Sequence, residues 1–157
     1  MKINVRMIRE KDFEEVAKLI ARLKSLNEEL NPHFKAVSNV REIALKYVEE
    51  TSKSENAFIL VAENWETGEI IGVIRIELVD RIFYEPRIKA VITDIYVKPK
   101  YRRKRVGVLL LEKAIAEAKR RGAGILSAIY PYGNVLAAEF YKKQGFSELQ
   151  REVYKPL

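Results

Sequence analysis

The spacing of hydrophobic and polar residues along the chain predicts an alternation of strands and helices. Alternating apolar and polar residues, or short runs rich in β-branched residues, are typical of strands, whereas apolar residues three and four positions apart form one face of a helix. The expected order is a strand over residues 3–8, helices over 12–23 and 39–50, strands over 57–63, 70–79 and 89–97, a helix over 106–121, a strand over 124–130, a helix over 134–144 and a strand over 146–154.

Turn and capping residues support several of these boundaries. Asp12 and Glu15 resemble a capping box at the start of the first helix. Gly68 lies in the turn between the second and third strands, where glycine can adopt a positive φ. Pro99 ends the fourth strand because it cannot donate to a strand ladder, and Gly122 follows the third helix as a C-cap.

This order of elements predicts an α/β fold in which helices cover a mixed sheet. The strand–helix–strand unit from Lys89 to Tyr130 should form a parallel pair with a right-handed crossover. A chain of 157 residues without repeats or a linker matches one domain, so residues 1–157 are expected to fold as a single unit.

Composition excludes several classes of protein. The chain has no Cys, which excludes a disulfide framework, a thiolate metal cluster and a cysteine nucleophile. No apolar run approaches the roughly 18–20 residues of a membrane span, and acidic residues stand where a signal peptide would be apolar. We therefore expect a cytoplasmic protein without a membrane partner. The net charge of +7 favours an anionic partner, either a phosphorylated cofactor or a nucleic acid.

A basic segment between the fourth strand and the third helix is the first candidate binding site. Four basic residues, Arg102 to Arg105, precede a helix that has Gly107 in its first turn. Such a helix start presents unpaired N–H groups and the positive end of the helix dipole, so a pyrophosphate is its natural ligand. Gly107 would allow that ligand to approach the backbone. A solvated basic turn and a contact with nucleic acid remain alternatives.

The helix over residues 134–144 carries a second group of candidate residues. Asn134 stands where an N-cap is expected, and Ala137, Phe140 and Tyr141 follow on adjacent turns. Packing in the core is an alternative role for both aromatic residues. Gly145 stands just after the helix.

Together the two segments resemble the GNAT superfamily of acetyl-CoA-dependent N-acetyltransferases. In its cofactor signature, Arg/Gln-x-x-Gly-x-Gly/Ala, Arg102 matches the first position and Gly107 the last. The later family motif, roughly Asn-x-x-Ala-x-x-Phe/Leu-Tyr-x-x-x-Gly-Phe, is matched at Asn134, Ala137, Phe140, Tyr141, Gly145 and Phe146. The resemblance covers nearly the whole chain. It implies a GNAT-like fold with a central sheet of six to seven strands, about four helices and a splayed parallel pair at the cofactor site.

One position departs from the family signature. Arg105 occupies the place of the first motif glycine. Because this residue lies at a helix start, we expect a negative φ, which would keep the N–H available and add a charge near the phosphates. A positive φ would strain an arginine and distort the loop.

The resemblance also implies roles for individual residues, with acetyl-CoA as cosubstrate and no metal. The pantetheine arm would lie along the fourth strand, the pyrophosphate on the following loop, and Asn134 would steady the cofactor arm. Tyr141 would lie near the sulfur and protonate the departing thiolate, since the reference pKa of tyrosine, about 10, is close to that of a thiol. The expected cofactor-binding residues are Ile95, Tyr96, Val97, Arg102, Arg103, Lys104, Arg105, Val106, Gly107, Val108, Asn134 and Tyr141.

The acceptor implied by the resemblance is a primary amine: a small amine or polyamine, an amino-acid derivative, or an amino group of a protein. Asp94 is the candidate base, although strand alternation could turn it away from the acceptor. Other candidates are Glu77, Asp80, Glu85 and a chain of waters, and His33 is a lone histidine in a loop. Two rival functions are a nucleic-acid-binding module, which leaves the second motif unexplained, and a regulatory domain that binds coenzyme A without catalysis. Many family members are dimers, and residues 146–154 could contribute to a homodimer interface.

Overall fold

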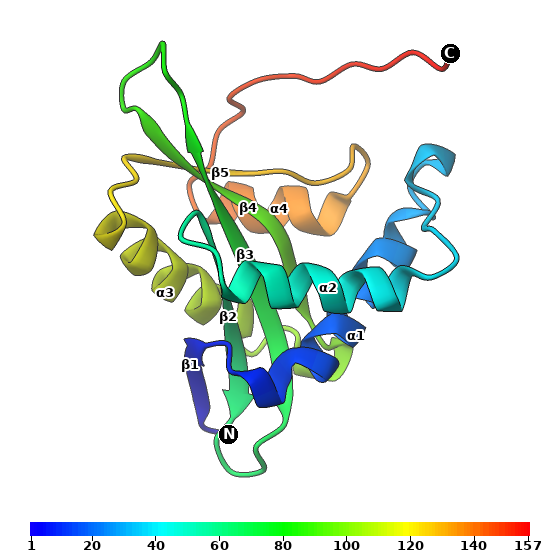
Figure 1. Cartoon of the computed structure of the whole chain (residues 1–157), viewed down its shortest axis with the longest axis vertical. Helices are drawn as coiled ribbons and strands as arrows, with labels where there is room; N and C mark the ends of the chain where they lie inside the picture. The colour runs from blue at the N-terminus through cyan, green and yellow to red at the C-terminus, as the bar shows by residue number, and fades with distance from the viewer.

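The centre of the computed structural model, which describes residues 1–157, is a five-stranded sheet with the order β1-β2-β3-β4-β5 (Figure 1). The strands are β1 (Ile3–Met7), β2 (Ala57–Asn64), β3 (Ile70–Asp80), β4 (Ile88–Val97) and β5 (Ile125–Ala128). Neighbouring strands are antiparallel from β1 to β4, and β5 is parallel to β4. The mixed α/β sheet and its parallel pair are therefore confirmed.

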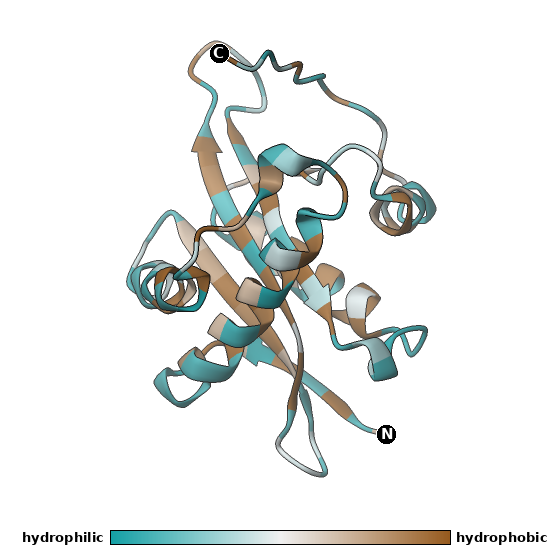
Figure 2. Cartoon of the chain, turned by 90° about the vertical axis from the view of Figure 1, so that its right-hand side faces the viewer, coloured by the Kyte–Doolittle hydropathy of each residue, from teal (hydrophilic) through white to brown (hydrophobic).

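Helices cover both faces of the sheet. They are α1 (Phe13–Asn27), α2 (Val40–Ser52), α3 (Val106–Arg120) and α4 (Val135–Lys143). Buried residues of α1 and α2 form one core cluster with one face of the sheet, and residues of α3 and α4 form a second cluster with the other face. Figure 2 shows the hydrophobic residues gathered on the strands and on the helix sides that face them. None of the helices has the length and apolarity that a membrane crossing requires.

Helix α3 lies close to the sheet because β3 has a glycine beneath it. A Cβ added to Gly72 would lie 3.2 Å from Leu110 Cδ1, Val106 Cγ1 and the carbonyl oxygen of Tyr96. This close approach places the start of α3 directly beside the end of β4, where the basic segment connects them. Gly72 thus helps to position the candidate cofactor loop.

Two sequence predictions differ from the structure. The sheet has five strands rather than six to seven because residues 146–154 are extended but pair with no strand. The expected capping box at the start of α1 is also wrong. The Asp12 carboxylate instead accepts hydrogen bonds from the Arg9 N–H, at 2.8 Å, and from the Arg6 guanidinium, at 2.7 and 3.0 Å. A buried ion pair between β1 and the start of α1 has replaced the cap.

Candidate active site

A β-bulge in β4 determines which side chains reach the candidate site. Asp94 lies opposite Arg75 of β3, whereas the next residue of β3 lies opposite Ile92, so Thr93 is an extra residue on β4. Ile92 and Ile95 contact the core cluster beneath α3, whereas Thr93 and Asp94 both lie on the side of α1 and α2. Without the bulge, alternation would have placed Asp94 on the same face as Ile92. The bulge thus determines on which face of the sheet the Asp94 side chain lies, which the sequence alone did not decide.

The Asp94 carboxylate is buried and held by three donors. It accepts hydrogen bonds from the Tyr47 hydroxyl, at 2.7 Å, and from the Thr93 hydroxyl, at 2.9 Å, and it forms an ion pair with the Lys24 ammonium. The Lys24 side chain is 40% exposed, whereas that of Asp94 is 0% exposed. Lys24 therefore covers the carboxylate from the solvent side. Burial, together with the Asp94 charge, raises the pKa of Tyr47.

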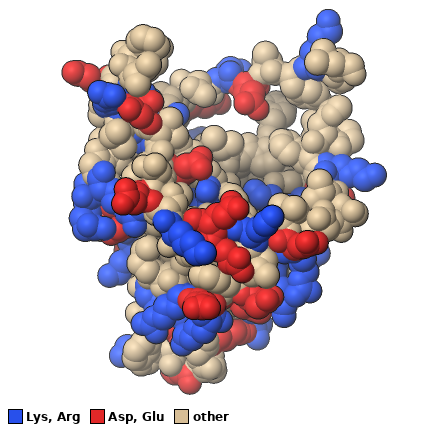
Figure 3. Space-filling view, in the orientation of Figure 1, with Lys and Arg blue, Asp and Glu red and all other residues tan.

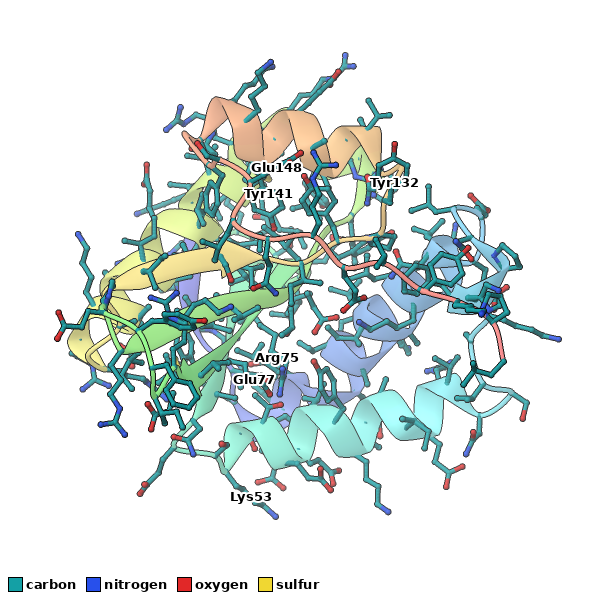
Figure 4. The ribbon with its side chains drawn as sticks, turned by 90° about the horizontal axis from the view of Figure 1, so that it is seen from above. Lys53, Arg75, Glu77, Tyr132, Tyr141 and Glu148 are labelled. Atoms are coloured by element: carbon teal, nitrogen blue, oxygen red, sulfur yellow. The ribbon has the colours of Figure 1, made fainter.

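A buried arginine, Arg75, contacts the hydroxyl residues that surround Asp94. Arg75 donates to the Thr51 hydroxyl at 2.9 Å and to the Thr93 hydroxyl at 3.0 Å, and its guanidinium lies 4.2 Å from the centre of the Tyr47 ring. Its remaining nitrogen forms an ion pair with Glu77 at 3.3 Å. Figure 4 shows Arg75 and Glu77 beside α2, on the side of the sheet opposite α4. Arg75 thus fixes the hydroxyl neighbours of Asp94.

The other carboxylates considered as bases lie elsewhere. Glu77 is committed to Arg75, and its side chain is 49% exposed. Asp80 lies five positions beyond Arg75 on β3, which is about 17 Å at roughly 3.3 Å per residue. Its carboxylate is bonded to Arg87 at 2.6 and 3.0 Å, and these bonds lower the pKa of Asp80. Glu85 lies in the hairpin loop beyond Asp80, and neither residue joins the Asp94 group.

Strands β4 and β5 separate just before Asp94. Their last backbone bond joins the Ile129 N–H to the Ile92 carbonyl at 3.1 Å. Beyond it, Lys98 donates to the Ile71 carbonyl of β3, so alternation turns the backbone groups of Ile95 and Val97 toward the open edge.

Side-chain contacts support this assignment of the edge. The Arg102 side chain donates to the Val97 carbonyl at 3.0 Å, which places that carbonyl on the open side. Tyr96 lies between the two edge residues, with its backbone toward β3 and its ring in the core cluster with α1. The backbone groups of Ile95 and Val97 therefore form the open edge of β4, and the Tyr96 ring anchors this part of the strand in the core.

Tyr141 lies on the opposite face from Asp94, on α4 (Figure 4). Its ring stacks on Tyr130, with centroids 5.5 Å apart, and meets Phe140 and Phe146 edge-on at 5.2 and 5.0 Å. The residue is 4% exposed, and its hydroxyl has no hydrogen-bond partner in the chain. Burial raises the pKa of Tyr141, and the charges of Tyr130 and Asp94 act in the same direction. The phenol therefore remains protonated at neutral pH.

Asn134 is the N-cap of α4, as predicted. Its side-chain oxygen accepts a hydrogen bond from the Ala137 N–H at 3.1 Å. Its role toward a cofactor arm stays a prediction.

The basic loop before α3 and the first turn of that helix contain a series of backbone donors that have no acceptor in the chain. No N–H group from Arg103 to Val108 has an acceptor within the chain, and the first bond of the helix is from Leu109 to the Arg105 carbonyl. Arg103 and Arg105 have φ values of 61° and 65°. The negative φ expected at Arg105 is therefore wrong. Left-handed residues of this kind cost on the order of 1–3 kcal/mol each, but they turn neighbouring N–H groups toward one side, as in anion-binding nests.

Gly107 has a packing role in addition to the one expected of it. A Cβ added there would lie 3.3 Å from the Phe140 ring. Glycine therefore lets the first turn of α3 approach α4. Contact of its backbone with a phosphate stays a prediction.

His33 lies apart from the residues around Asp94. It belongs to a short 3₁₀ turn between α1 and α2, and its ring is 5.2 Å from that of Tyr154. The structure gives it no contact with the candidate acid or base.

Sequence reasoning missed the residues that surround Asp94: Lys24, Tyr47, Thr51, Arg75 and Thr93. A signal was present for two of them. Arg75 is the only charged residue in the apolar run Ile70–Ile76, and Lys24 continues the stripe of Val16 and Ile20 at four-residue spacing. A charged residue on a buried face requires a partner, and that partner is the polar group at the bulge.

Comparisons with known proteins identify the family and the fold of the chain. The model of the acetyltransferase (GNAT) family matches residues 23–146. The uncharacterised N-acetyltransferase MJ1207 of Methanocaldococcus jannaschii is 42% identical over 71 residues, which are 45% of this chain and 30% of that protein. The chain thus spans less than a third of that relative.

Two solved structures share the fold. The tetramutant of the BH1408 protein from Bacillus halodurans is 21% identical with a TM-score of 0.86, covering 98% of this chain and 99% of that one. The aminoglycoside N-acetyltransferase AAC(6')-Iy in complex with CoA is 16% identical with a TM-score of 0.77, covering 99% and 95%. With a family match across most of its length, the chain belongs to the GNAT family, whose members use acetyl-CoA as the acyl donor.

Proposed function

We propose that this protein transfers an acetyl group from acetyl-CoA directly to a primary amine at the point where β4 and β5 separate. The observation that carries the proposal is the convergence of four features there. The open edge of β4 lies between the free N–H groups of the basic loop and the Asp94 carboxylate, and Tyr141 lies across the sheet. These features offer an anion site, an extended backbone edge, a base on one face of the sheet and an acid on the other.

The donor would be held by the loop and the open edge. The N–H groups from Arg103 to Val108 and the positive end of α3 would hold the pyrophosphate, with the side chains of Arg102 to Arg105 adding charge. The backbone of Ile95 and Val97 would bond the pantetheine amides, as a strand bonds its neighbour. The Arg102 side chain donates a hydrogen bond to the Val97 carbonyl, so this bond would have to break before a pantetheine amide could donate to that carbonyl.

The proton steps are divided between the two sides of β4. Acetyl-CoA supplies the thioester; transfer forms a C–N bond to the amine and breaks the C–S bond. Tyr141, kept protonated by burial, would give its proton to the departing sulfur. Asp94 would take the proton from the amine, either directly or through the hydroxyls of Tyr47 and Thr93. With no Cys in the chain, no thiol can carry the acetyl group, so the transfer is direct.

The acceptor class follows from the contact between Lys24 and Asp94. An ammonium group already lies on the carboxylate, at a position that remains 40% exposed. An acceptor that arrives as an alkylammonium would compete for the same oxygen, and the Lys24 side chain would have to move. Cationic amines are therefore the first class to test, and aminoglycosides belong in the screen because a structural neighbour is an aminoglycoside N-acetyltransferase.

The first experiment is calorimetric titration with acetyl-CoA at two salt concentrations, with duplex DNA as a competing ligand. We expect saturable one-to-one binding of acetyl-CoA that DNA does not displace. Failure to bind acetyl-CoA, together with salt-sensitive binding of DNA, would contradict the proposal and assign the basic loop to nucleic acid. Binding of acetyl-CoA without thiol release in the presence of any amine would point to a regulatory domain.

A further inference from the structure

The Lys24 ammonium lies where the proposed mechanism requires the acceptor amine. Lys24 is in the last turn of α1, and Asp94 is its only hydrogen-bond or ion-pair partner in the chain. The Asp94 side chain has no exposed surface while Lys24 covers it, whereas 40% of the Lys24 side chain is exposed. An amine from solution therefore cannot contact the carboxylate until Lys24 moves, but Lys24 itself already does.

The acetyl group of the donor would lie close to this ammonium. In the proposed function, the thioester is at the open edge of β4, which begins at Ile95, the residue after Asp94. Burial and the charges of Tyr130 and Asp94 raise the pKa of Tyr141, so the charge of the proposed base acts on the proposed acid across the sheet. An acetyl group placed between base and acid would have the Lys24 nitrogen as its nearest amine.

We propose that Lys24 is an acetylation site, modified by the protein itself when acetyl-CoA is bound and no acceptor amine is present. This inference rests on the proposed function, because it uses the same base and acid. A C–N bond forms between Lys24 Nζ and the acetyl carbonyl carbon, and the C–S bond of the thioester breaks. The ammonium loses two protons: one passes through Asp94 to water, and the other replaces the proton that Tyr141 gives to the departing sulfur. The nucleophile is held by the chain, so it needs no binding step of its own.

Acetylation of Lys24 would change the acceptor site. The amide that forms carries no charge, so the ion pair with Asp94 is lost. The carboxylate is then available to an ammonium group from solution. Since the Lys24 side chain is partly exposed, the added acetyl group has room to project into solvent. The modification would thus prepare the site for a cationic acceptor.

Exposure alone does not distinguish Lys24 from other lysines. Basic side chains are spread over the surface, with acidic side chains among them (Figure 3). Lys18, on the same helix, is 51% exposed but pairs only with Glu15, at 3.9 Å. Transfer by the active site should therefore modify Lys24, whereas spontaneous reaction with acetyl-CoA should modify Lys18 as well.

The first test is mass spectrometry with peptide mapping, before and after incubation of the protein with acetyl-CoA in the absence of any amine. We expect one added acetyl group per chain, on Lys24, at a rate independent of protein concentration because the transfer occurs within one chain. Lys24→Arg keeps the charge and should stay unmodified, whereas Lys18→Arg should react like wild type. Asp94→Asn should react about 10²-fold more slowly. Equal acetylation of Lys18 and Lys24, or an unchanged rate in Asp94→Asn, would show a spontaneous reaction and overturn the proposal.

A second measurement follows the acceptor site. Initial rates with a cationic amine are compared between protein that receives acetyl-CoA last and protein that was first incubated with acetyl-CoA. We expect the incubation to lower KM for the amine about fivefold in wild type, as for the loss of one ion pair, and to leave Lys24→Arg unchanged. An unchanged KM in protein fully acetylated on Lys24 would contradict the preparatory role of the modification.

Self-acetylation and the proposed function can fail separately. Thiol release with an external amine, while Lys24 stays unmodified, would overturn self-acetylation and leave the proposed function standing. Acetylation of Lys24 without transfer to any external amine would support self-acetylation and contradict transfer to a separate acceptor.

Discussion

Each face of β4 lies against an ionisable group that is buried in the core, and the surroundings of the two groups are opposite in kind. On the face toward α1 and α2, the Asp94 carboxylate is surrounded by a lysine, two hydroxyls and an arginine beneath them. On the face toward α4, Tyr141 lies among aromatic rings, and its hydroxyl has no partner in the chain. One face holds a charge with donors, and the other keeps a proton in place by burial, which raises the pKa of Tyr141.

The difference suits one strand to both halves of the proposed proton transfer. The reference pKa of tyrosine, about 10, already lies far above that of aspartate, about 3.9, and the sheet keeps the two groups in separate environments. The separation also makes each face open to independent test by substitutions that leave the other unchanged.

Tyr141→Phe is expected to have the largest effect. It removes the proposed proton donor but keeps the ring that packs on Tyr130 and Phe146. We expect kcat to fall by about 10²- to 10³-fold, within the range for general acids, with little change in acetyl-CoA affinity. Steady-state assays of thiol release and calorimetry measure the two quantities. An unchanged kcat would leave Tyr141 with a packing role only.

Asp94→Asn tests the other face and should reduce kcat by about 10²-fold. The amide keeps the shape of the side chain but cannot accept the proton from the amine. Glu77→Gln is the matched control, because it removes a carboxylate that bonds only to Arg75 and is half exposed. We expect that control to retain at least half of the wild-type kcat; equal losses in both variants would show that the effect comes from disturbing Arg75.

Much of this arrangement was accessible from the sequence. Hydrophobic periodicity placed all four helices and the first five strands, and the two motifs located the loop before α3 and the helix that carries Tyr141. Asn134 was identified as an N-cap because its side chain and position suffice for that role. These features are local, so a single stretch of chain determines them.

Features that depend on pairing between distant segments were not accessible. A bulge exists only relative to the neighbouring strand, so the direction of Asp94 could not be read from β4 alone. The ion pair of Lys24 with Asp94 joins residues separated by 70 positions. The φ of Arg105 follows from how the loop closes onto α3, which overrides the preference of arginine itself.

Lys24→Met should have a smaller effect, limited to the binding of the acceptor amine. Removing the ammonium that lies on Asp94 removes an internal competitor, so we expect KM for a cationic amine to fall about fivefold, the equivalent of roughly 1 kcal/mol. Lys18→Met is the control, since Lys18 lies on the same helix, is exposed, and pairs only with Glu15 at 3.9 Å. A rise in KM would mean that Lys24 stabilises the acceptor site instead of competing with the acceptor.

The smallest expected effect is on stability at high pH. Because the pKa of Tyr141 is raised in the folded state, the unfolded chain loses its proton first, and the free energy of unfolding falls as pH rises above about 10. Tyr141→Phe should remove this contribution, on the order of 1 kcal/mol near pH 10.5, in denaturant titrations from pH 8 to 11. Tyr132→Phe, at a site that is 99% exposed, should leave the pH dependence unchanged. Parallel curves for wild type and Tyr141→Phe would contradict the raised pKa.

The extra residue at Thr93 has a consequence for how such sites change during evolution. Loss of Thr93 would leave Ile92 and Asp94 opposite Ile76 and Arg75, so the pairing would become regular while every other side chain kept its face. The group would lose the Thr93 hydroxyl, which donates to Asp94, but not the carboxylate itself. Loss of a residue from a regular part of the strand would instead exchange the faces of the residues beyond it. Relatives are therefore better compared by the face each side chain occupies than by aligned letters.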